Sequence, residues 1–204
     1  MYKRSVTFIK IPSFPIAVER VVSRTLLKRP VVISQGASAR NLCLAVSDEA
    51  AAMGIRIGMP LSKARRFCRS LTTMLPNPHL YKRAVNAIWK IASDYTPLGE
   101  PARPGQYYLD MTGSNRLFGG AMPATDKIKA RIISELRLPA EAGIATNKLV
   151  SRAATFGTHS GEVLEVEQGA EEPFIAPFSV TILPSSEKRV SESLSDLNIE
   201  IVRQ

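Results

Sequence analysis

Basic side chains are the residues of this chain whose type and spacing best suit a defined chemistry, the neutralisation of phosphate groups. A predicted amphipathic helix over residues 60–69 carries basic residues on the face left over by Leu61, Ala64, Phe67 and Cys68. A second predicted helix, over residues 147–156, places two basic residues four positions apart. Phosphate contact requires only positive charge at suitable spacing. The candidate phosphate-binding residues are Arg56, Lys63, Arg65, Arg66, Arg69, Lys148 and Arg152.

The charges are divided unevenly along the chain. Its 204 residues have a formal net charge of +9. Residues 1–93 hold sixteen Lys and Arg against three Asp and Glu, whereas residues 94–204 hold eleven against fifteen. This asymmetry favours a nucleic-acid partner over an acidic protein or an anionic membrane. The alternative is that the basic residues form solvated helix faces, and for Lys148 and Arg152 both interpretations stay open.

Other reactive side chains give no support to catalysis. His79 and His159 are isolated in the sequence. Cys43 and Cys68 lie in apolar surroundings too far apart for a zinc-ligand pair, so we expect buried, reduced thiols. No stretch approaches the roughly eighteen apolar residues of a membrane span, and the N-terminus lacks a signal-peptide pattern. We therefore expect a soluble, cytoplasmic protein with no membrane partner.

The predicted elements mix strands and helices and favour an α+β fold. Strands are predicted over residues 6–10, 30–34, 41–47, 106–111 and 142–145, and helices over residues 14–23, 48–53, 60–69, 79–95, 124–136 and 147–156. Ser47 or Asp48 suits the cap of the helix over 48–53, and Gly54 suits its left-handed end. Glu19 is expected to be an internal hydrogen-bond or ion-pair partner. Residues 173–204 predict short helices separated by turns.

Four segments carry recognisable sequence motifs. They are FIKIPSFPIAVE at residues 8–19, SDEAAAMG at 47–54 followed by RIGMP at 56–60, YYLD at 107–110, and GIATNK at 143–148. In order and spacing they resemble the motifs of Y-family DNA polymerases, the UmuC and DinB group that copies damaged templates. The resemblance covers about residues 5–200.

The resemblance implies a polymerase-like architecture. Residues 1–12 and 78–165 would form a palm, an antiparallel sheet with helices on one face. Residues 13–77 would form a small α/β fingers insertion, and residues 166–204 the start of a helical thumb. In that family a little-finger domain that grips duplex DNA follows the thumb, and we expect it to be absent from this chain, which ends at Gln204.

The same resemblance places the family's metal-binding positions on residues that are not carboxylates. The first metal-binding aspartate falls on Lys10, the position two residues further on falls on Pro12, and the paired Asp-Glu falls on Gly105 and Gln106. Two Mg²⁺ ions need several carboxylates. An ammonium in place of one turns attraction into repulsion of about a few kcal/mol per charge pair at an effective dielectric near 20. The resemblance therefore implies no bound metal, no cofactor and no catalytic residue, and Asp110 is expected to cap a turn or pair with an arginine.

The nucleotide-binding positions are altered as well. The family's tyrosine and arginine in the fingers fall on Asp48 and Ala51, and its aromatic gate against ribonucleotides falls on Pro15. The carboxylate of Asp48 would repel a phosphate. We therefore expect no nucleotide and no other small-molecule substrate.

We infer a noncatalytic Y-family homologue that binds DNA as an accessory factor in DNA repair, translesion synthesis or the SOS response, similar to the ImuB-type accessory proteins of bacterial mutagenesis cassettes. Its expected partners are DNA and a replicative or repair polymerase or its sliding clamp. One alternative is an active nucleotidyltransferase that uses displaced acids such as Asp94, Glu100 and Asp110. Another is a protein-interaction module whose basic surface meets an acidic partner without DNA.

Overall fold

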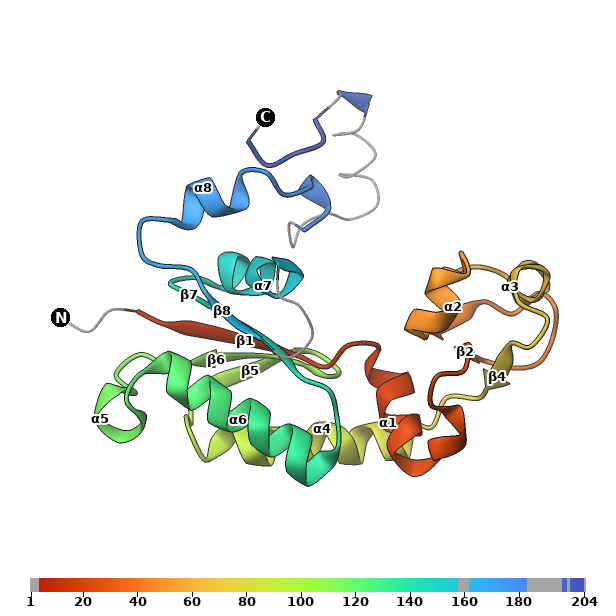
Figure 1. The fold of residues 1–204 in the computed structure, drawn as a ribbon, viewed down its shortest axis with the longest axis horizontal. Coiled ribbons are helices and arrows are strands. Elements are labelled where there is room, and N and C mark those ends of the chain that lie inside the picture. The colour runs from red at the N-terminus through yellow and green to blue at the C-terminus, as the bar shows by residue number, and fades with distance from the viewer. Residues whose placement is uncertain (1–3, 158–161, 183–195, 198, 204) are drawn as a thin grey trace. The chain divides into compact units, whose positions relative to one another are not determined.

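The computed structural model describes residues 4–157, 162–182, 196–197 and 199–203 (Figure 1). His159 and part of the predicted helical segment 173–204 lie outside the described residues. The chain forms two compact units. The first comprises Met1–Lys10, Ile91–Arg131 and Ala140–Gln204, and the second comprises Ile11–Lys90 and Ile132–Pro139. The palm, fingers and thumb ranges inferred from the sequence use other boundaries and stay predictions.

A five-stranded sheet lies at the centre of the first unit, with the strand order β5-β6-β1-β7-β8. The strands are β1 (Val6–Lys10), β5 (Gly99–Arg103), β6 (Gln106–Asp110), β7 (Glu141–Ala145) and β8 (Val163–Glu165). The central strand β1 is antiparallel to both β6 and β7, and β8 runs parallel to β7. Four of the five β1 residues are buried, as expected for a strand covered on both faces.

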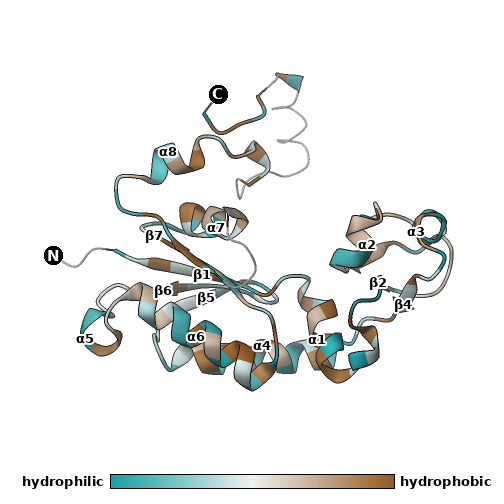
Figure 2. Ribbon diagram, in the orientation of Figure 1, coloured by the Kyte–Doolittle hydropathy of each residue, from teal (hydrophilic) through white to brown (hydrophobic). Residues whose placement is uncertain are grey.

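Helices cover both faces of this sheet (Figure 1). On one face α7 (Lys148–Gly157) packs against β7 and β1, and a Cβ at Gly143 would overlap the Ser151 carbonyl and the Ala154 side chain. On the other face the hydroxyls of Thr7 and Thr125 lie 3.0 Å apart, which joins β1 to α6 (Ala121–Leu136). The expectation of helices on one face was therefore wrong, because Gly143 lets α7 approach the second face closely. Figure 2 shows apolar and polar bands alternating along α6, as in an amphipathic helix.

The second unit is built around the three-stranded sheet β3-β2-β4. Its strands are β2 (Val31–Ser34), β3 (Cys43–Val46) and β4 (Thr72–Met74), and its helices are α1 (Phe14–Val22), α2 (Asp48–Ala52), α3 (Leu61–Phe67), the short 3₁₀ helix η1 (Arg24–Leu26) and most of α4 (Pro78–Ser93). Both cysteines are free and buried in the core formed by β2, β3, α2 and α3, as predicted. Burial raises the pKa of the Cys43 thiol, so it is held as the neutral thiol.

Most predicted elements are confirmed within one to three residues at each end. The Ser47 hydroxyl accepts a hydrogen bond from the Ala50 amide at 3.2 Å and caps α2, and Gly54 follows the helix with φ 89°. The sequence did not predict the strands β4, β5 and β8 or the short helix α5 (Asn115–Phe118). It also gave no separate bounds for the helix α8 (Glu171–Ile175). The 3₁₀ helix η2 covers Val180–Ile182. Within the described part of the chain, none of the helices has the length and apolar character needed to cross a membrane.

Candidate functional site

Lys10, Gly105 and Gln106 meet at one end of the five-stranded sheet. Lys10 is the last residue of β1 and is the register partner of Gln106 on β6 and of Glu141 on β7. Gly105 occupies the turn that precedes β6, with φ 77°. The antiparallel register thus brings Lys10 together with Gly105 and Gln106, which lie far from it in the sequence.

An ion pair lies at this end of the sheet. The Lys10 Nζ is 2.9 Å from Glu141 Oε2, and it lies 5.4 Å from the centre of the Phe156 ring. The two charged side chains are 26% and 18% exposed, so both are largely removed from solvent. The sequence alone identified neither Glu141 nor Phe156 as part of the site. No local sequence signal could have found Glu141, because its position opposite Lys10 depends on the register of β1 with β7.

The side chains at this end of the sheet do not fit a magnesium site. Mg²⁺ prefers carboxylate and other oxygen ligands in octahedral geometry. Here the converging groups are an ammonium, a glycine without a side chain and a neutral amide. The nearby carboxylate of Glu141 is already bound to Lys10. A cation at about 4 Å from the ammonium would be repelled by about 4 kcal/mol per unit charge at an effective dielectric of 20.

Of the acids considered as displaced metal ligands, Glu100 and Asp110 line one hollow together with Lys148, whereas Asp94 does not line it. Asp94 pairs with Arg131 at 2.7 Å, and Glu100 pairs with Lys148 at 2.6 Å. Asp110 lies at the opposite end of β6 from Gln106, where its Oδ1 accepts a hydrogen bond from the Thr112 amide at 2.9 Å. The turn-capping role expected for Asp110 is thereby confirmed. Among the residues that the structure describes, no three His, Cys, Asp or Glu side chains cluster so as to hold a metal.

The three positions linked to nucleotide binding lie in the second unit, as does Pro12, which the family correspondence assigns to metal binding. Pro12 lies shortly after β1, and Pro15 is in the first turn of α1, where a missing amide proton costs no hydrogen bond. Asp48 begins α2 and accepts a hydrogen bond from the Ser13 hydroxyl at 3.4 Å. Ala51 lies within α2 and packs, partly buried, against the core of the second unit. None of these four side chains offers a positive charge to a phosphate.

The five candidate phosphate-binding residues of the second unit fall into two groups. Arg56 is engaged within the protein, because its Nη1 donates hydrogen bonds to the Ala51 carbonyl at 2.6 Å and to the Ile55 carbonyl at 3.0 Å. The other four, Lys63, Arg65, Arg66 and Arg69, are exposed on or just beyond α3. Leu61 and Ala64 are fully buried on the opposite face of α3, which turns the basic face outward. An open hollow lined by Ser62, Lys63, Arg66 and Phe67 places a half-exposed aromatic ring among these charges.

The basic pair of the first unit is engaged within that unit. The Lys148 Nζ is 2.6 Å from Glu100 Oε1 and 5.6 Å from the centre of the Tyr108 ring. Burial raises the pKa of Tyr108, and the charges of Arg152 and Lys148 oppose that rise. The pair is therefore partly neutralised by its own neighbours, whereas the α3 residues carry an outward-facing charge.

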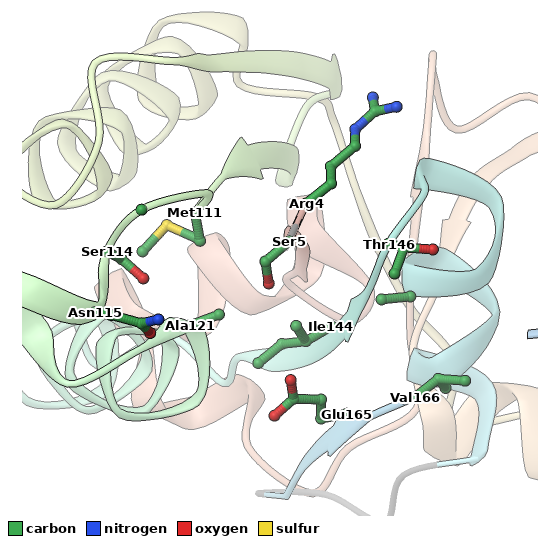
Figure 3. A pocket seen from close by; sticks show the side chains of 12 residues that line it. Arg4, Ser5, Met111, Ser114, Asn115, Ala121, Ile144, Thr146, Glu165 and Val166 are labelled. Carbon is green, nitrogen blue, oxygen red and sulfur yellow. The ribbon is translucent and has the colours of Figure 1, made fainter. Parts of the chain in front are cut away.

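A small cavity of about 100 Å³ lies near the start of β1, and none of the candidate metal-, nucleotide- or phosphate-binding residues lines it. Figure 3 shows Asn115, Ile144 and Glu165 around this cavity, with the Arg4 side chain extending away from it. Its lining residues come from α5, α6, β7 and β8, from the segment just before β1 and from the loops beside these elements. The cavity therefore marks a junction of elements at the end of the sheet away from Lys10.

The fold of the chain defines a class of protein, because it matches the palm and fingers region of Y-family DNA polymerases. The chain matches the crystal structure of DinB from Sulfolobus solfataricus with a TM-score of 0.83 and 20% identity, covering 98% of this chain and 59% of that one. It matches the insertion ternary complex of Dbh DNA polymerase with a TM-score of 0.83 and 19% identity, covering 97% and 58%. At these identities the likeness establishes the fold, and the predicted α+β class is confirmed.

The sequence comparisons agree with this class. The model of the impB/mucB/samB family matches residues 9–156, and the chain belongs to that family. It is 31% identical over 197 residues to DNA polymerase IV of Dehalococcoides mccartyi (strain CBDB1), which covers 97% of this chain and 50% of that protein. It is 28% identical over 199 residues to DNA polymerase IV of Pseudomonas syringae pv. tomato, covering 98% and 56%. The chain thus spans about half the length of the curated relatives it matches.

Proposed function

We propose that this chain is a noncatalytic Y-family polymerase homologue that binds DNA and serves as an accessory factor in DNA repair or translesion synthesis in the cytoplasm. The observation that carries the proposal is the Lys10–Glu141 ion pair at the end of the sheet. By the family correspondence, the carboxylates that bind magnesium belong at Lys10, Gly105 and Gln106. At this position the positive charge of the Lys10 ammonium would repel a divalent ion.

The altered nucleotide positions support the same proposal. A residue that handles a triphosphate needs a positive or hydrogen-bond-donating side chain. Asp48 carries the opposite charge, and Ala51 and Pro15 carry neither group. The side chains that would bind the incoming nucleotide are therefore missing together with those that would bind the metal ions. The side chains at this site give no support to a polymerase reaction.

DNA binding is the part of the polymerase function that the side chains still favour. The exposed basic face of α3, with Phe67 beside Lys63 and Arg66, suits phosphate contact and stacking on a base. Arg56, Lys148 and Arg152 stay within the proposed set, although each has an interaction within the protein that DNA would have to compete with or share. The family resemblance suggests a polymerase or its sliding clamp as the protein partner of such a noncatalytic homologue.

Two measurements on the purified chain test the proposal. A gel-shift titration with single-stranded, duplex and primer-template DNA should give affinities that fall with salt at a log–log slope of about −4 to −5, for about five neutralised phosphates. Primer extension with Mg²⁺ should give no incorporation. A flat salt response would exclude DNA as the partner. Mg²⁺-dependent extension that disappears on Asp110→Ala would instead favour the nucleotidyltransferase with displaced acids.

A further inference from the structure

An apolar groove lies on the second unit, and none of the residues assigned to the polymerase-like site lines it. It has a volume of about 370 Å³. The residues that line it come from α1, α4 and the end of α6: Val18, Val21, Val22, Leu80, Arg83, Ala84, Ala87, Leu136 and Leu138. Eight of these nine side chains are aliphatic. Figure 2 shows the apolar character of α1, which forms one wall.

A buried polar contact holds α1 and α4 side by side and fixes the groove. The Tyr81 hydroxyl on α4 donates a hydrogen bond of 3.0 Å to Glu19 on α1, and Glu19 is only 6% exposed. The Phe14 and Tyr81 rings meet edge to face at 6.3 Å. Burial and the neighbouring Glu19 carboxylate raise the pKa of Tyr81 to about 12, so the phenol keeps its donor proton at neutral pH. The expected role of Glu19 as an internal hydrogen-bond partner is confirmed.

The groove presents apolar surface to solvent. Val22 is 67% exposed and Val21 is 37% exposed. On α1 the three valines follow the spacing i, i+3, i+4, and on α4 Leu80, Ala84 and Ala87 follow i, i+4, i+7. Apolar stripes at helical spacing on two neighbouring helices are the kind of surface that receives the apolar face of an amphipathic helix.

The surroundings of the groove are positively charged. Arg83 lines it directly, and the exposed Arg137 lies between the two leucines that close it. The whole second unit carries fourteen Lys and Arg against four Asp and Glu, an excess of ten positive charges. A partner that fills the groove must therefore place its own charges beside this rim, and acidic residues are favoured there.

From these observations we propose that the groove binds an amphipathic helix of a partner protein, with aliphatic anchors flanked by Asp and Glu. Nucleic acid does not suit it, because phosphates would lie against aliphatic side chains. A second copy of this chain does not suit it either, because each copy carries a net charge of +9 and the same basic rim. This inference is independent of the proposed DNA binding, which uses α3.

The test uses two synthetic fluorescent peptides of about 18 residues, long enough to form a helix. Both carry leucine at the spacing i, i+3, i+4, i+7, and their flanking residues are glutamate in one and lysine in the other. Fluorescence anisotropy measures the binding of each to the full chain. The glutamate-flanked peptide is expected to bind, with an affinity at least about tenfold above that of the lysine-flanked peptide.

Two variants locate the binding, and each has a matched control. Val22→Asp should weaken binding of the acidic peptide by about tenfold, because it removes one buried aliphatic contact and adds a like charge. Its control, Leu117→Asp, changes an 80% exposed leucine outside the groove and should leave binding unchanged. Arg83→Glu should weaken the acidic peptide and strengthen the lysine-flanked one, whereas the neighbouring Lys82→Glu, with the same change in net charge, should have a smaller effect on both.

Each outcome decides the proposal. Equal binding of both peptides, or equal loss in Val22→Asp and Leu117→Asp, would overturn it. Self-association that disappears in Val22→Asp would also overturn it and would make a second copy the occupant. In every case the DNA affinity of Val22→Asp should equal that of the unaltered chain, because Val22 lies outside the DNA-binding set. If neither the unaltered chain nor Val22→Asp binds DNA, the proposed DNA binding by α3 fails, and the proposal for the groove is unaffected.

Discussion

Replacing Lys10 by methionine should destabilise the first unit, because it leaves the Glu141 carboxylate without its counter-charge. Glu141 is only 18% exposed, so little water can take the place of the ammonium. The aliphatic part of the lysine side chain is retained by methionine, and the packing against Phe156 is largely kept. The expected loss therefore reports the charge and not the volume of the side chain.

The magnitude follows from the geometry. Unit charges 2.9 Å apart attract each other by about 6 kcal/mol at an effective dielectric of 20. Desolvation of both groups and the entropy lost by the lysine side chain offset most of this attraction. A net coupling free energy of about 1–2 kcal/mol is expected, above the about 0–1 kcal/mol of a fully solvated pair.

A double-mutant cycle measures this coupling. The free energies of unfolding of Lys10→Met, Glu141→Gln and the double variant are determined by urea denaturation followed by circular dichroism. The matched control is the cycle of Lys148→Met and Glu100→Gln, because that pair is 48% and 55% exposed and should couple by less than about 0.5 kcal/mol. If the Lys10 cycle couples no more strongly than the control, the ion pair does not exist as described, and the physical basis for an emptied metal site fails.

Three other changes have expected outcomes. Gly143→Ala should destabilise the chain by about 1–3 kcal/mol in the same urea assay, because the added Cβ overlaps the Ser151 carbonyl and the Ala154 side chain, and an unchanged midpoint would contradict the close packing of α7. Tyr81→Phe should reduce the loss of stability at high pH. The folded-state pKa of Tyr81, about 12, lies above its ordinary value of 10.0, so the contribution of Tyr81 to stability is complete below pH 10 and is lost as the pH rises toward 12. Identical profiles of stability against pH for the two proteins would refute the raised pKa. Lys63→Ala combined with Arg66→Ala should make the salt slope of DNA binding less steep by about 2. The matched pair Lys82→Ala and Lys90→Ala should leave that slope unaltered.

Local patterns were sufficient to predict the elements whose residues carry a clear period or a strong end signal. The β-branched run before Pro12 predicted β1, and Ser47 and Gly54 predicted both ends of α2. The missed strand β5 contains Pro101, is mostly exposed and lies at the edge of the sheet. Proline is tolerated on an edge strand because its missing amide can face solvent, so the residue types there argue against a strand that does form.

The site was predictable in part for a related reason. The correspondence with a known family located Lys10, Gly105 and Gln106, and the register of β1 and β6 brings them together. The pairing of Lys10 with Glu141 joins residues 131 positions apart and depends on the register of β1 with β7, which no local pattern reveals. The basic residues could not be separated from the sequence either, because the carbonyls that bind Arg56 and the carboxylate that binds Lys148 are known only from the fold.

The proposed loss of metal binding is tested most directly by titrating the purified chain with Mn²⁺ and measuring the free ion by electron paramagnetic resonance. The unaltered chain is expected to bind no stoichiometric Mn²⁺, whereas Lys10→Asp combined with Gln106→Glu should gain a site, because the two introduced carboxylates lie in register with each other and beside Glu141. Stoichiometric binding by the unaltered chain that disappears on Glu141→Gln would show that this end of the sheet still holds a metal ion, and the account of a noncatalytic body would be wrong.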